Sequence, residues 1–235
     1  MGNLNFNPHL FLSQLEVVNP NSAIKDTQYK MIEKAVPYSL TEEEGIIMYN
    51  FIKKFKLKSG FEIATAFGVS TMYLGNAFKE VGGKLTSIDA YVEELFENHL
   101  YGDIYAEVER IKMNISQGIY PIGYVYAKNM IESYNLEETV DLKIGLSPDD
   151  VTEVNGEIEF AFIDGGHHGM QPLHDTVAAL SLMKNEKKVL FFHDNINNPS
   201  IDLAIQFAKE RFKTTPIIFD TKQKLTLVTN MNIFD

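Results

Sequence analysis

Two apolar runs in the second half of the sequence end on similar polar side chains. Residues 160–168 read FAFIDGGHH, and residues 189–195 read VLFFHDN. If the two runs are neighbouring parallel strands joined by a right-handed crossover helix, their polar ends lie at the same edge of one sheet. That edge is the candidate catalytic site, and its side chains are Asp164, His167, His168, His193, Asp194 and Asn195.

The rest of the chain predicts the alternation of strands and helices that would position this edge. Predicted strands lie around Glu62 and at residues 84–89, 141–146, 159–163, 188–192, 215–220 and 224–230, the last two as a hairpin. A capping box at residues 41–44 opens one helix, and Gly82-Gly83 ends another. Another helix carries Met170, Leu173, Val177, Leu180 and Met183 on one face, and a further one covers residues 200–212. The pattern predicts an α/β, Rossmann-like, doubly wound fold: a mostly parallel seven-stranded sheet with a C-terminal antiparallel hairpin and helices on both faces.

Two segments do not fit a plain repeat of strand and helix. Residues 1–38 predict an N-terminal helical cap in front of a domain at 39–235. About fifty residues separate Asp89 from the strand at 141–146, which predicts an insertion at about 91–135. The insertion is rich in aromatic side chains: Tyr91, Phe96, Tyr101, Tyr105, Tyr120, Tyr124 and Tyr126. These rings are candidates for a lid, a substrate wall or a homodimer surface, or they pack helices onto the sheet.

The composition limits the kinds of molecule that the protein is expected to bind. The formal net charge of −11 leaves no basic surplus for binding nucleic acid or an anionic membrane surface, so we expect small-molecule partners. No apolar run approaches the length of a membrane span, and the chain does not begin like a signal peptide. The absence of cysteine excludes thiolate metal ligands and thiol nucleophiles and fits a cytoplasmic location.

The turn after the first strand favours one nucleoside cofactor over another. Residues 64–70 read ATAFGVS and contain a single glycine. A dinucleotide site needs several glycines so that the backbone can approach a pyrophosphate. S-adenosylmethionine has no pyrophosphate, so a small-residue turn with exposed amides and hydroxyls suffices for it. Asp89, at the end of the next strand, could accept hydrogen bonds from the ribose hydroxyls of either cofactor.

From about residue 39 to residue 230, the sequence resembles class I S-adenosylmethionine-dependent methyltransferases. Within them it is most similar to metal-dependent O-methyltransferases of the catechol O-methyltransferase type and to related antibiotic and sugar O-methyltransferases. Residues 62–70 resemble the first motif of the family, with Ala64 in place of its first glycine, and residues 145–149 resemble the loop beside the adenine. The resemblance implies a set of cofactor-binding residues: Glu62, Ala64, Thr65, Ala66, Gly68, Ser70, Asp89, Ser147, Pro148 and Asp164.

The resemblance also implies a metal site and a general base. Asp164, Asp194 and Asn195 match the ligands of a divalent cation, and such oxygen ligands suit Mg²⁺. Carboxyl ends of adjacent parallel strands lie about 4.8 Å apart, so both acids can reach one ion. His167 matches the general base, which makes Asp164 and His167 the predicted catalytic residues. The implied reaction is Mg²⁺-assisted O-methylation of a small hydroxylated molecule.

Other interpretations stay open from the sequence alone. Asp164 and Asp194 would contact the methyl donor directly if no metal binds. His193 would only brace its strand end, and we expect His168 and His174 to be loop and surface residues. Gly165 and Gly166 would let the cofactor pass close to the backbone. Two further functions compete: a metal-dependent hydrolase using the histidine and aspartate cluster, and a methyltransferase-like binding module without catalysis.

Overall fold

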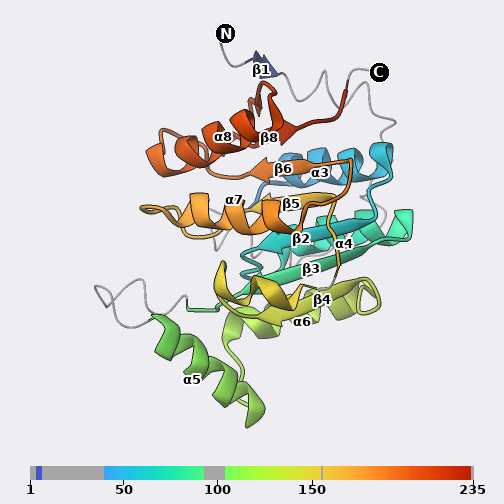
Figure 1. Ribbon diagram of the computed structural model, residues 1–235. Helices are drawn as coiled ribbons and strands as arrows, with labels where there is room; N and C mark the ends of the chain where they lie inside the picture. Colours follow the sequence, from blue (N-terminus) through green and yellow to red (C-terminus); the bar gives the residue numbers. More distant parts are fainter. Residues whose placement is uncertain (1–3, 7–39, 93–103, 155, 234–235) are drawn as a thin grey trace.

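The computed structural model describes residues 4–6, 40–92, 104–154 and 156–233 (Figure 1). In this part of the chain an eight-stranded sheet has the order β1-β7-β8-β6-β5-β2-β3-β4. Its strands are β1 (Leu4–Phe6), β2 (Ser59–Ile63), β3 (Lys84–Asp89), β4 (Val140–Ile144), β5 (Phe160–Ile163), β6 (Val189–Phe192), β7 (Ile217–Phe219) and β8 (Thr226–Thr229). All seven predicted strands are present, and β1 adds an eighth beside β7. The rest of the expected N-terminal cap lies outside the described residues.

The sheet is parallel except at one strand. Five adjacent strands pair in parallel with their neighbours, in the order β4, β3, β2, β5 and β6. β8 lies between β6 and β7 and runs antiparallel to both. The predicted C-terminal hairpin is therefore confirmed. Because the strands of the parallel group all end at one edge, the loops that follow them can meet in a single site.

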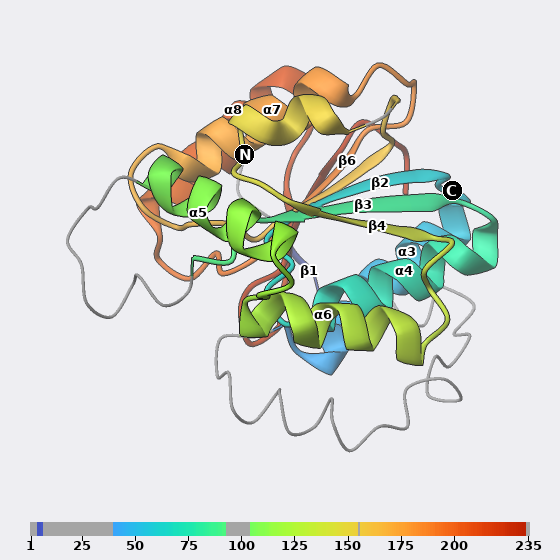
Figure 2. The ribbon, with the colours of Figure 1, turned by 90° about the horizontal axis from the view of Figure 1, so that it is seen from below.

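Helices cover both faces of the sheet, as predicted. α3 (Glu42–Phe55), α4 (Val69–Val81) and α6 (Ile122–Ser133) lie on one face, and α7 (Gln171–Leu182) and α8 (Pro199–Phe212) lie on the other (Figure 2). Successive side chains of β5 point to opposite faces of the sheet. Phe160 and Phe162 belong to the apolar cluster on the α3 side, and Ala161 and Ile163 belong to the cluster on the α7 side. Such a strand is buried on both faces, which explains its uninterrupted apolar sequence.

The helix α3 begins with the predicted capping box. The Thr41 side chain accepts a hydrogen bond from the backbone N–H of Glu44, and the Glu44 carboxylate accepts one from the backbone N–H of Thr41. The predicted apolar positions Ile47, Phe51 and Ile52 are fully buried. Glu44 itself is also fully buried, which a residue in a local cap does not require.

The apolar face predicted for α7 packs only in part. Met183 is 3% exposed, and the partly buried Leu180 packs against the same apolar cluster. Met170 and Val177, which belong to the same predicted face, are 49% and 47% exposed. The residues that α7 itself buries are small or polar: Pro172, Asp175, Thr176, Ala178 and Ala179. Apolar periodicity does not detect these smaller side chains.

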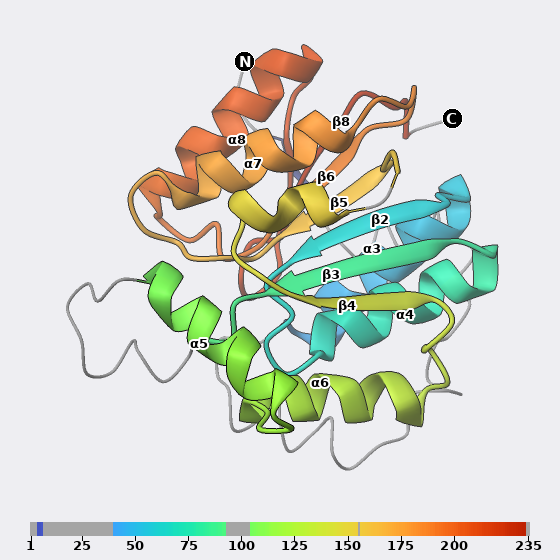
Figure 3. The same cartoon turned by 60° about the horizontal axis from the view of Figure 1, so that its bottom comes forward.

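The insertion between β3 and β4 contains α5 (Ile104–Ser116) in addition to α6. α5 lies across the carboxyl ends of β3 and β4 (Figure 3), where Val108 and Ile111 pack against Ala90 and Val92. Lys112 of α5 forms an ion pair with Asp150 at 3.2 Å, next to η3 (Asp149–Glu153). Phe96, Tyr101 and the side chain of Tyr105 lie outside the described residues. α5 therefore forms a wall beside the loop that follows β4.

Among the described helices, none is both long enough and apolar enough to cross a lipid bilayer.

Candidate active site

The predicted catalytic edge is formed by the ends of β5 and β6. The two strands are direct parallel neighbours, with Ile163 opposite Phe192. Asp164 follows the first strand, and His193 and Asp194 follow the second, so register alone brings these side chains together. The expectation that both acids emerge at one edge is confirmed.

Asp164, His167 and Asp194 form a compact cluster at this edge. Ligand atoms from these three side chains all lie within 4.8 Å of one another. His167 lies between the acids, with Nε2 3.6 Å from Asp164 Oδ1 and Nδ1 3.3 Å from Asp194 Oδ2. The side chain of Asn198 holds the loop by donating a hydrogen bond to the backbone carbonyl of His167 at 3.2 Å. A hydrogen bond from the adjacent helix start thus fixes the backbone of His167.

The donor set of this cluster fits a divalent cation. Two carboxylates converge on one point, and His167 Nε2 is buried and makes no hydrogen bond with another described residue. Asp164 and Asp194 are half-buried, and two neighbouring carboxylates of this kind can share one cation. Asn195 directs Nδ2 to Thr226 Oγ1 at 3.0 Å, so its Oδ1 would be the atom available to an ion. The role of Asn195 as third ligand stays a prediction.

The buried His193 lies close to Asp164, to Asp194 and to the carboxylate of Glu44. Its Nδ1 lies 3.0 Å from Asp164 Oδ1 and 3.5 Å from Asp194 Oδ1, and its Nε2 lies 3.3 Å from Glu44 Oε2. Burial lowers the pKa of His193, but Asp164, Asp194 and Glu44 raise it well above its usual value. Burial likewise raises the pKa of Asp164, but the charge of His193 and the proximity of His167 hold it below its usual value. His193 thus does more than brace its strand end.

Backbone geometry at this edge is strained. Asp194 has φ 52°, in the left-handed region that non-glycine residues rarely adopt. Ala64 and Ala66, in the turn after β2, have φ 77° and 45°. Residues held in this region without being glycine gather at functional sites.

The turn after β2 has the backbone conformation of a glycine-rich turn, although it contains a single glycine. Ala64, Ala66 and Gly68 all have positive φ, in an A-x-A-x-G pattern. Gly68 begins α4, and a Cβ on it would lie 2.8 Å from the Cα of Ala127 in α6. Ala64 and Ala66 thus adopt a backbone conformation that favours glycine. The conformation of Ala66 was not predicted from the sequence, although the spacing A-x-A-x-G was its signal.

Glu62 lies under this turn in a buried network of hydroxyl groups. Its Oε2 accepts hydrogen bonds from Thr71 Oγ1 at 2.6 Å and from Ser87 Oγ at 2.5 Å. Its Oε1 is buried and makes no hydrogen bond with another described residue. Burial raises the pKa of Glu62 to about 7, against the hydroxyls of Ser70, Ser87 and Thr71, which lower it. A buried acid with a free oxygen and no cation beside it is suited to a ligand that donates hydrogen bonds or carries positive charge.

Asp89 holds the same turn from the end of β3. Its Oδ2 accepts a hydrogen bond from the backbone N–H of Ala66 at 2.7 Å, and its Oδ1 accepts one from that of Tyr91 at 2.6 Å. Burial raises the pKa of Asp89, and these amides oppose the rise. Each carboxylate oxygen has a second lone pair, so the predicted ribose contact is compatible with these bonds.

The loop after β4 is tied to α7 by polar side chains. Gln171 Nε2 donates hydrogen bonds to the Ser147 carbonyl and to Asp175 Oδ1, both at 2.8 Å. Burial raises the pKa of Asp175 to about 6, while the Ser147 hydroxyl and Gln171 lower it. A Cβ on Gly165 would lie 2.7 Å from Asp175 Oδ2, so the packing of Asp175 itself requires glycine there. Ser147 and Pro148, predicted to contact the adenine, thus lie in a loop that Gln171 anchors.

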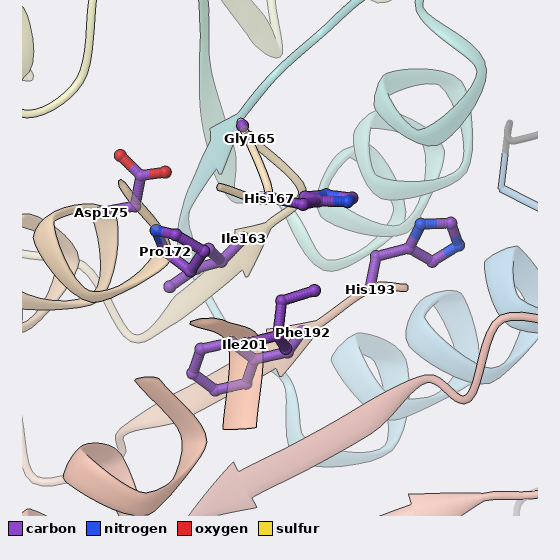
Figure 4. Close-up of a pocket in the computed structure, with 9 residues that line it drawn as sticks. Ile163, Gly165, His167, Pro172, Asp175, Phe192, His193 and Ile201 are labelled. Atoms are coloured by element: carbon purple, nitrogen blue, oxygen red, sulfur yellow. The ribbon is translucent and has the colours of Figure 1, made fainter. Parts of the chain in front are cut away.

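Figure 4 shows the cavity behind the Asp164–His167 loop, with His167 and His193 on one side and Asp175 on the other. The cavity measures about 10 Å³, which is room for one water molecule. It is a packing gap between β5, α7 and α8, and it is too small for a cofactor or a substrate. His168 and His174 are exposed, as expected.

Aromatic rings from the insertion border the cofactor turn. Phe67 contacts Tyr126 edge-on at 5.7 Å, and Tyr91 contacts Tyr124 edge-on at 5.6 Å. Tyr124 in turn stacks on Tyr120 at 5.4 Å. Tyr120 and Tyr126 are 45% and 42% exposed, so these rings pack against the loop and also present aromatic surface to solvent.

The comparison with known proteins agrees with this geometry. A family described as a methyltransferase domain matches residues 61–195, which is more than half of the chain. No curated protein matches the chain in sequence. Among solved structures, an O-methyltransferase from Bacillus cereus in complex with SAH has a TM-score of 0.60 at 14% identity, with 94% of each chain covered.

Two further structures show the same fold. The O-methyltransferase TomG from Streptomyces achromogenes, involved in tomaymycin synthesis and solved with SAM, has a TM-score of 0.57 at 15% identity over 97% of each chain. A putative caffeoyl-CoA O-methyltransferase from Staphylococcus aureus has a TM-score of 0.61 at 12% identity, with 94% of this chain and 96% of that chain covered. The resemblance seen in the sequence is confirmed: the chain belongs to the methyltransferase-domain family and has the class I methyltransferase fold.

Proposed function

We propose that the protein transfers the methyl group of S-adenosylmethionine to a hydroxyl group of a small molecule, with a divalent cation held by Asp164 and Asp194. The observation that carries the proposal is the convergence of these acids with His167, within 4.8 Å of one another, at the sheet edge that also carries the turn after β2. A methyl donor at that turn and a hydroxyl substrate at the cation would lie at one edge of the sheet.

The β2 and β3 ends support the cofactor part of the proposal. The unused Oε1 of Glu62 and the spare lone pairs of Asp89 are acceptors that pair with no cationic side chain among the described residues. S-adenosylmethionine offers an ammonium group and two ribose hydroxyls, which are the donors such acids need. The Bacillus cereus and Streptomyces achromogenes proteins, which share this fold, were solved with SAH and SAM.

The β5 and β6 ends support the cation part. Asp164 and Asp194 would hold the ion together with Asn195 Oδ1, and Mg²⁺ prefers such oxygen ligands. When bound, the ion would lower the pKa of a substrate hydroxyl and orient it. The proposal for a small hydroxylated substrate rests on the ligand positions that three protein ligands leave open.

His167 is the base in this scheme. The His167 ring lies between the two acids, so it is within reach of a hydroxyl placed at the same point. His167 takes the hydroxyl proton, the substrate oxygen forms a bond to the methyl carbon, and the bond from that carbon to sulfur breaks to leave neutral S-adenosylhomocysteine. Asp164 and Asp194 hold the reacting groups in place, which is the main contribution of the protein.

The two competing functions fit the structure less well. A hydrolase would use the histidine and aspartate cluster but would leave the turn, Glu62 and Asp89 without a role. A non-catalytic module would follow if Ala64, in place of the first glycine of the motif, had disrupted the turn. Ala64 has the positive φ that favours glycine, which argues against such a loss.

Binding and turnover assays test the proposal. We expect S-adenosylhomocysteine to bind in calorimetry, and we expect methyl transfer from labelled S-adenosylmethionine to catechols and related hydroxylated compounds to require Mg²⁺ or Mn²⁺. His167→Ala should abolish transfer and keep cofactor binding, whereas the matched control His174→Ala, at an exposed histidine, should behave as wild type. No S-adenosylhomocysteine binding, with or without the ion, would refute the proposal.

A further inference from the structure

The buried Glu44 joins three parts of the chain that are far apart in sequence. Its Oε2 accepts hydrogen bonds from the backbone N–H of Thr41 at 3.0 Å and from Thr41 Oγ1 at 2.8 Å. Its Oε1 accepts one from the backbone N–H of Gln223, in the loop between β7 and β8, at 3.0 Å. The same Oε2 lies 3.3 Å from His193 Nε2, at the end of β6. Glu44 therefore ties the start of α3 and the β7–β8 loop to the catalytic edge.

A local helix cap does not account for this arrangement. A glutamate in a capping box usually lies at the surface, where its contact with the cap residue is its whole role. Glu44 is fully buried, and so is His193, which is 1% exposed. Burial of a carboxylate is unfavourable unless a charge or several hydrogen bonds compensate it, and the His193 imidazole, with Nε2 3.3 Å from Oε2, joins Thr41 and Gln223 in doing so.

The His193 ring connects Glu44 to the carboxylates of Asp164 and Asp194. Glu44 holds Nε2, which fixes the rotation of the ring, and Nδ1 then lies 3.0 Å from Asp164 Oδ1 and 3.5 Å from Asp194 Oδ1. Phe162 packs edge-on against the ring at 5.9 Å between centroids and restricts it further. Nδ1 thus contacts one oxygen of each acid.

We propose that Glu44 and His193 are positioning residues that hold the Asp164 and Asp194 carboxylates in the arrangement that binds a divalent cation. The inference rests on the function proposed above. Neither residue touches the substrate, because Glu44 is separated from the acids by the imidazole ring and His193 is enclosed behind them. Partners that orient the ligands of a metal commonly change its affinity by about ten- to a hundredfold when they are removed.

The test is the dissociation constant of Mn²⁺, measured by electron paramagnetic resonance on the full chain, beside that of S-adenosylhomocysteine measured by calorimetry. Glu44→Gln keeps the size of the side chain but removes its charge and leaves one acceptor oxygen for the donors of His193, Thr41 and Gln223, which now share two. We expect it to weaken Mn²⁺ about tenfold and to change S-adenosylhomocysteine affinity less than about twofold. His193→Asn should weaken Mn²⁺ similarly, and the double variant should be no weaker than either single one, because the pair acts as a unit.

Thr41→Ala separates positioning from capping. It removes the cap and one hydrogen bond to Glu44 but leaves the contact between Glu44 and His193. It should lower the melting temperature and leave the Mn²⁺ dissociation constant unchanged. If Glu44→Gln does not fold, His193→Asn against Thr41→Ala makes the same comparison.

Three results would overturn the inference. Unchanged Mn²⁺ affinity in Glu44→Gln and His193→Asn would leave the proposed function standing without this pair. An equal loss of Mn²⁺ and S-adenosylhomocysteine affinity would show general disruption of the site. Absence of Mn²⁺ binding in the wild type would remove the cation from the proposed function and this inference with it.

Discussion

The proposed catalytic edge has two halves whose acids are stabilised in different ways. At the ends of β5 and β6, Asp164 and Asp194 lie beside His167 and His193. At the ends of β2 and β3, Glu62 and Asp89 accept hydrogen bonds from hydroxyls and backbone amides. The first half places imidazoles beside its acids, whereas no cationic side chain among the described residues pairs with the acids of the second half.

The pKa values show what the difference means. Burial raises the pKa of Asp164 and of Glu44, but contact with His193 outweighs it, so both are lowered, that of Glu44 to about 2. Burial raises the pKa of Glu62 to about 7, because its hydroxyl neighbours compensate only in part. An acid that the fold leaves destabilised is ready for a ligand that supplies donors or positive charge. The comparison therefore supports a ligand that supplies donors or positive charge at the β2 and β3 half, whereas the cation proposed for the β5 and β6 half rests on the convergence of Asp164, His167 and Asp194.

The largest effect is expected in the cation half. Asp194→Asn removes one of the two converging carboxylate charges, and we expect turnover to fall about a hundredfold or more. Affinity for S-adenosylhomocysteine should stay within about threefold, because the other half is untouched. Steady-state methyl transfer beside calorimetry measures both quantities. Asp202→Asn, at an exposed position of α8, is the matched control and should behave as wild type.

Replacement of glutamate by glutamine should change the free energy of unfolding in opposite directions at Glu62 and at Glu44, which contacts the β5 and β6 half. Glu62 has a raised folded-state pKa, so the wild type loses stability as pH rises from about 4.5 to about 7, and Glu62→Gln avoids that loss. At pH 8 we expect Glu62→Gln to raise the free energy of unfolding by about 2–3 kcal/mol. At pH 5 the gain should shrink to less than about 1 kcal/mol.

Glu44 has a lowered folded-state pKa, so its contribution is present above about pH 4.5 and is lost as pH falls towards about 2. Glu44→Gln should therefore lower the free energy of unfolding at pH 8 by about 2 kcal/mol or more. Urea unfolding at both pH values measures these differences, with the exposed Glu42→Gln as control. Changes of the same sign in both halves would contradict the comparison.

Cofactor affinity should depend on pH through Glu62. Because the pKa of Glu62 is raised to about 7, its carboxylate becomes neutral as pH falls below that value. A neutral Glu62 attracts the ammonium group of the cofactor less, so S-adenosylhomocysteine should bind about tenfold more weakly at pH 5.5 than at pH 7.5. Calorimetry at the two pH values measures the ratio. Glu62→Gln should flatten the dependence, and an unchanged dependence in that variant would assign it to other groups.

The smallest effect concerns the turn after β2. Ala64 and Ala66 have positive φ, which disfavours any residue with a Cβ by about 1–2 kcal/mol. Ala64→Gly should therefore stabilise the protein by about 1 kcal/mol in thermal unfolding, after part of the relief is offset by the freedom of glycine in the unfolded chain. Ala77→Gly, within the helix α4, should instead destabilise by about 1 kcal/mol or more. Destabilisation by both would mean that the turn is not strained.

Much of the fold was readable from the sequence because strands buried on both faces leave an uninterrupted apolar run. β5 and β6 were predicted within one residue of their bounds, and the convergence of Asp164 and Asp194 followed from the parallel order alone. The packed face of α7 could be predicted from the sequence only in part, because many of its buried residues are small or polar, such as Thr176 and Ala179. Long-range complementarity, not periodicity, decides such a face.

The site was readable in its acids but not in the residues behind them. Glu44 already had a complete local explanation as the last residue of the capping box at residues 41–44, and no sequence pattern links it to His193, which is 149 positions away. Asp175 lay on a helix predicted to bury apolar side chains, so its burial beside Gly165 was not expected. Local motifs identify groups that begin helices or end strands, whereas contacts between distant elements appear only once the topology is known.

Calorimetric titration of two variants with two ligands tests the division of the edge most directly. Asp89→Ala and Asp194→Asn would each be titrated with S-adenosylhomocysteine and with Mn²⁺, beside the wild type. The account predicts that Asp89→Ala loses about tenfold or more in affinity for S-adenosylhomocysteine and keeps its affinity for Mn²⁺, whereas Asp194→Asn shows the reverse. If each variant lost affinity for both ligands to the same extent, the two halves would be one site, and the account would be contradicted.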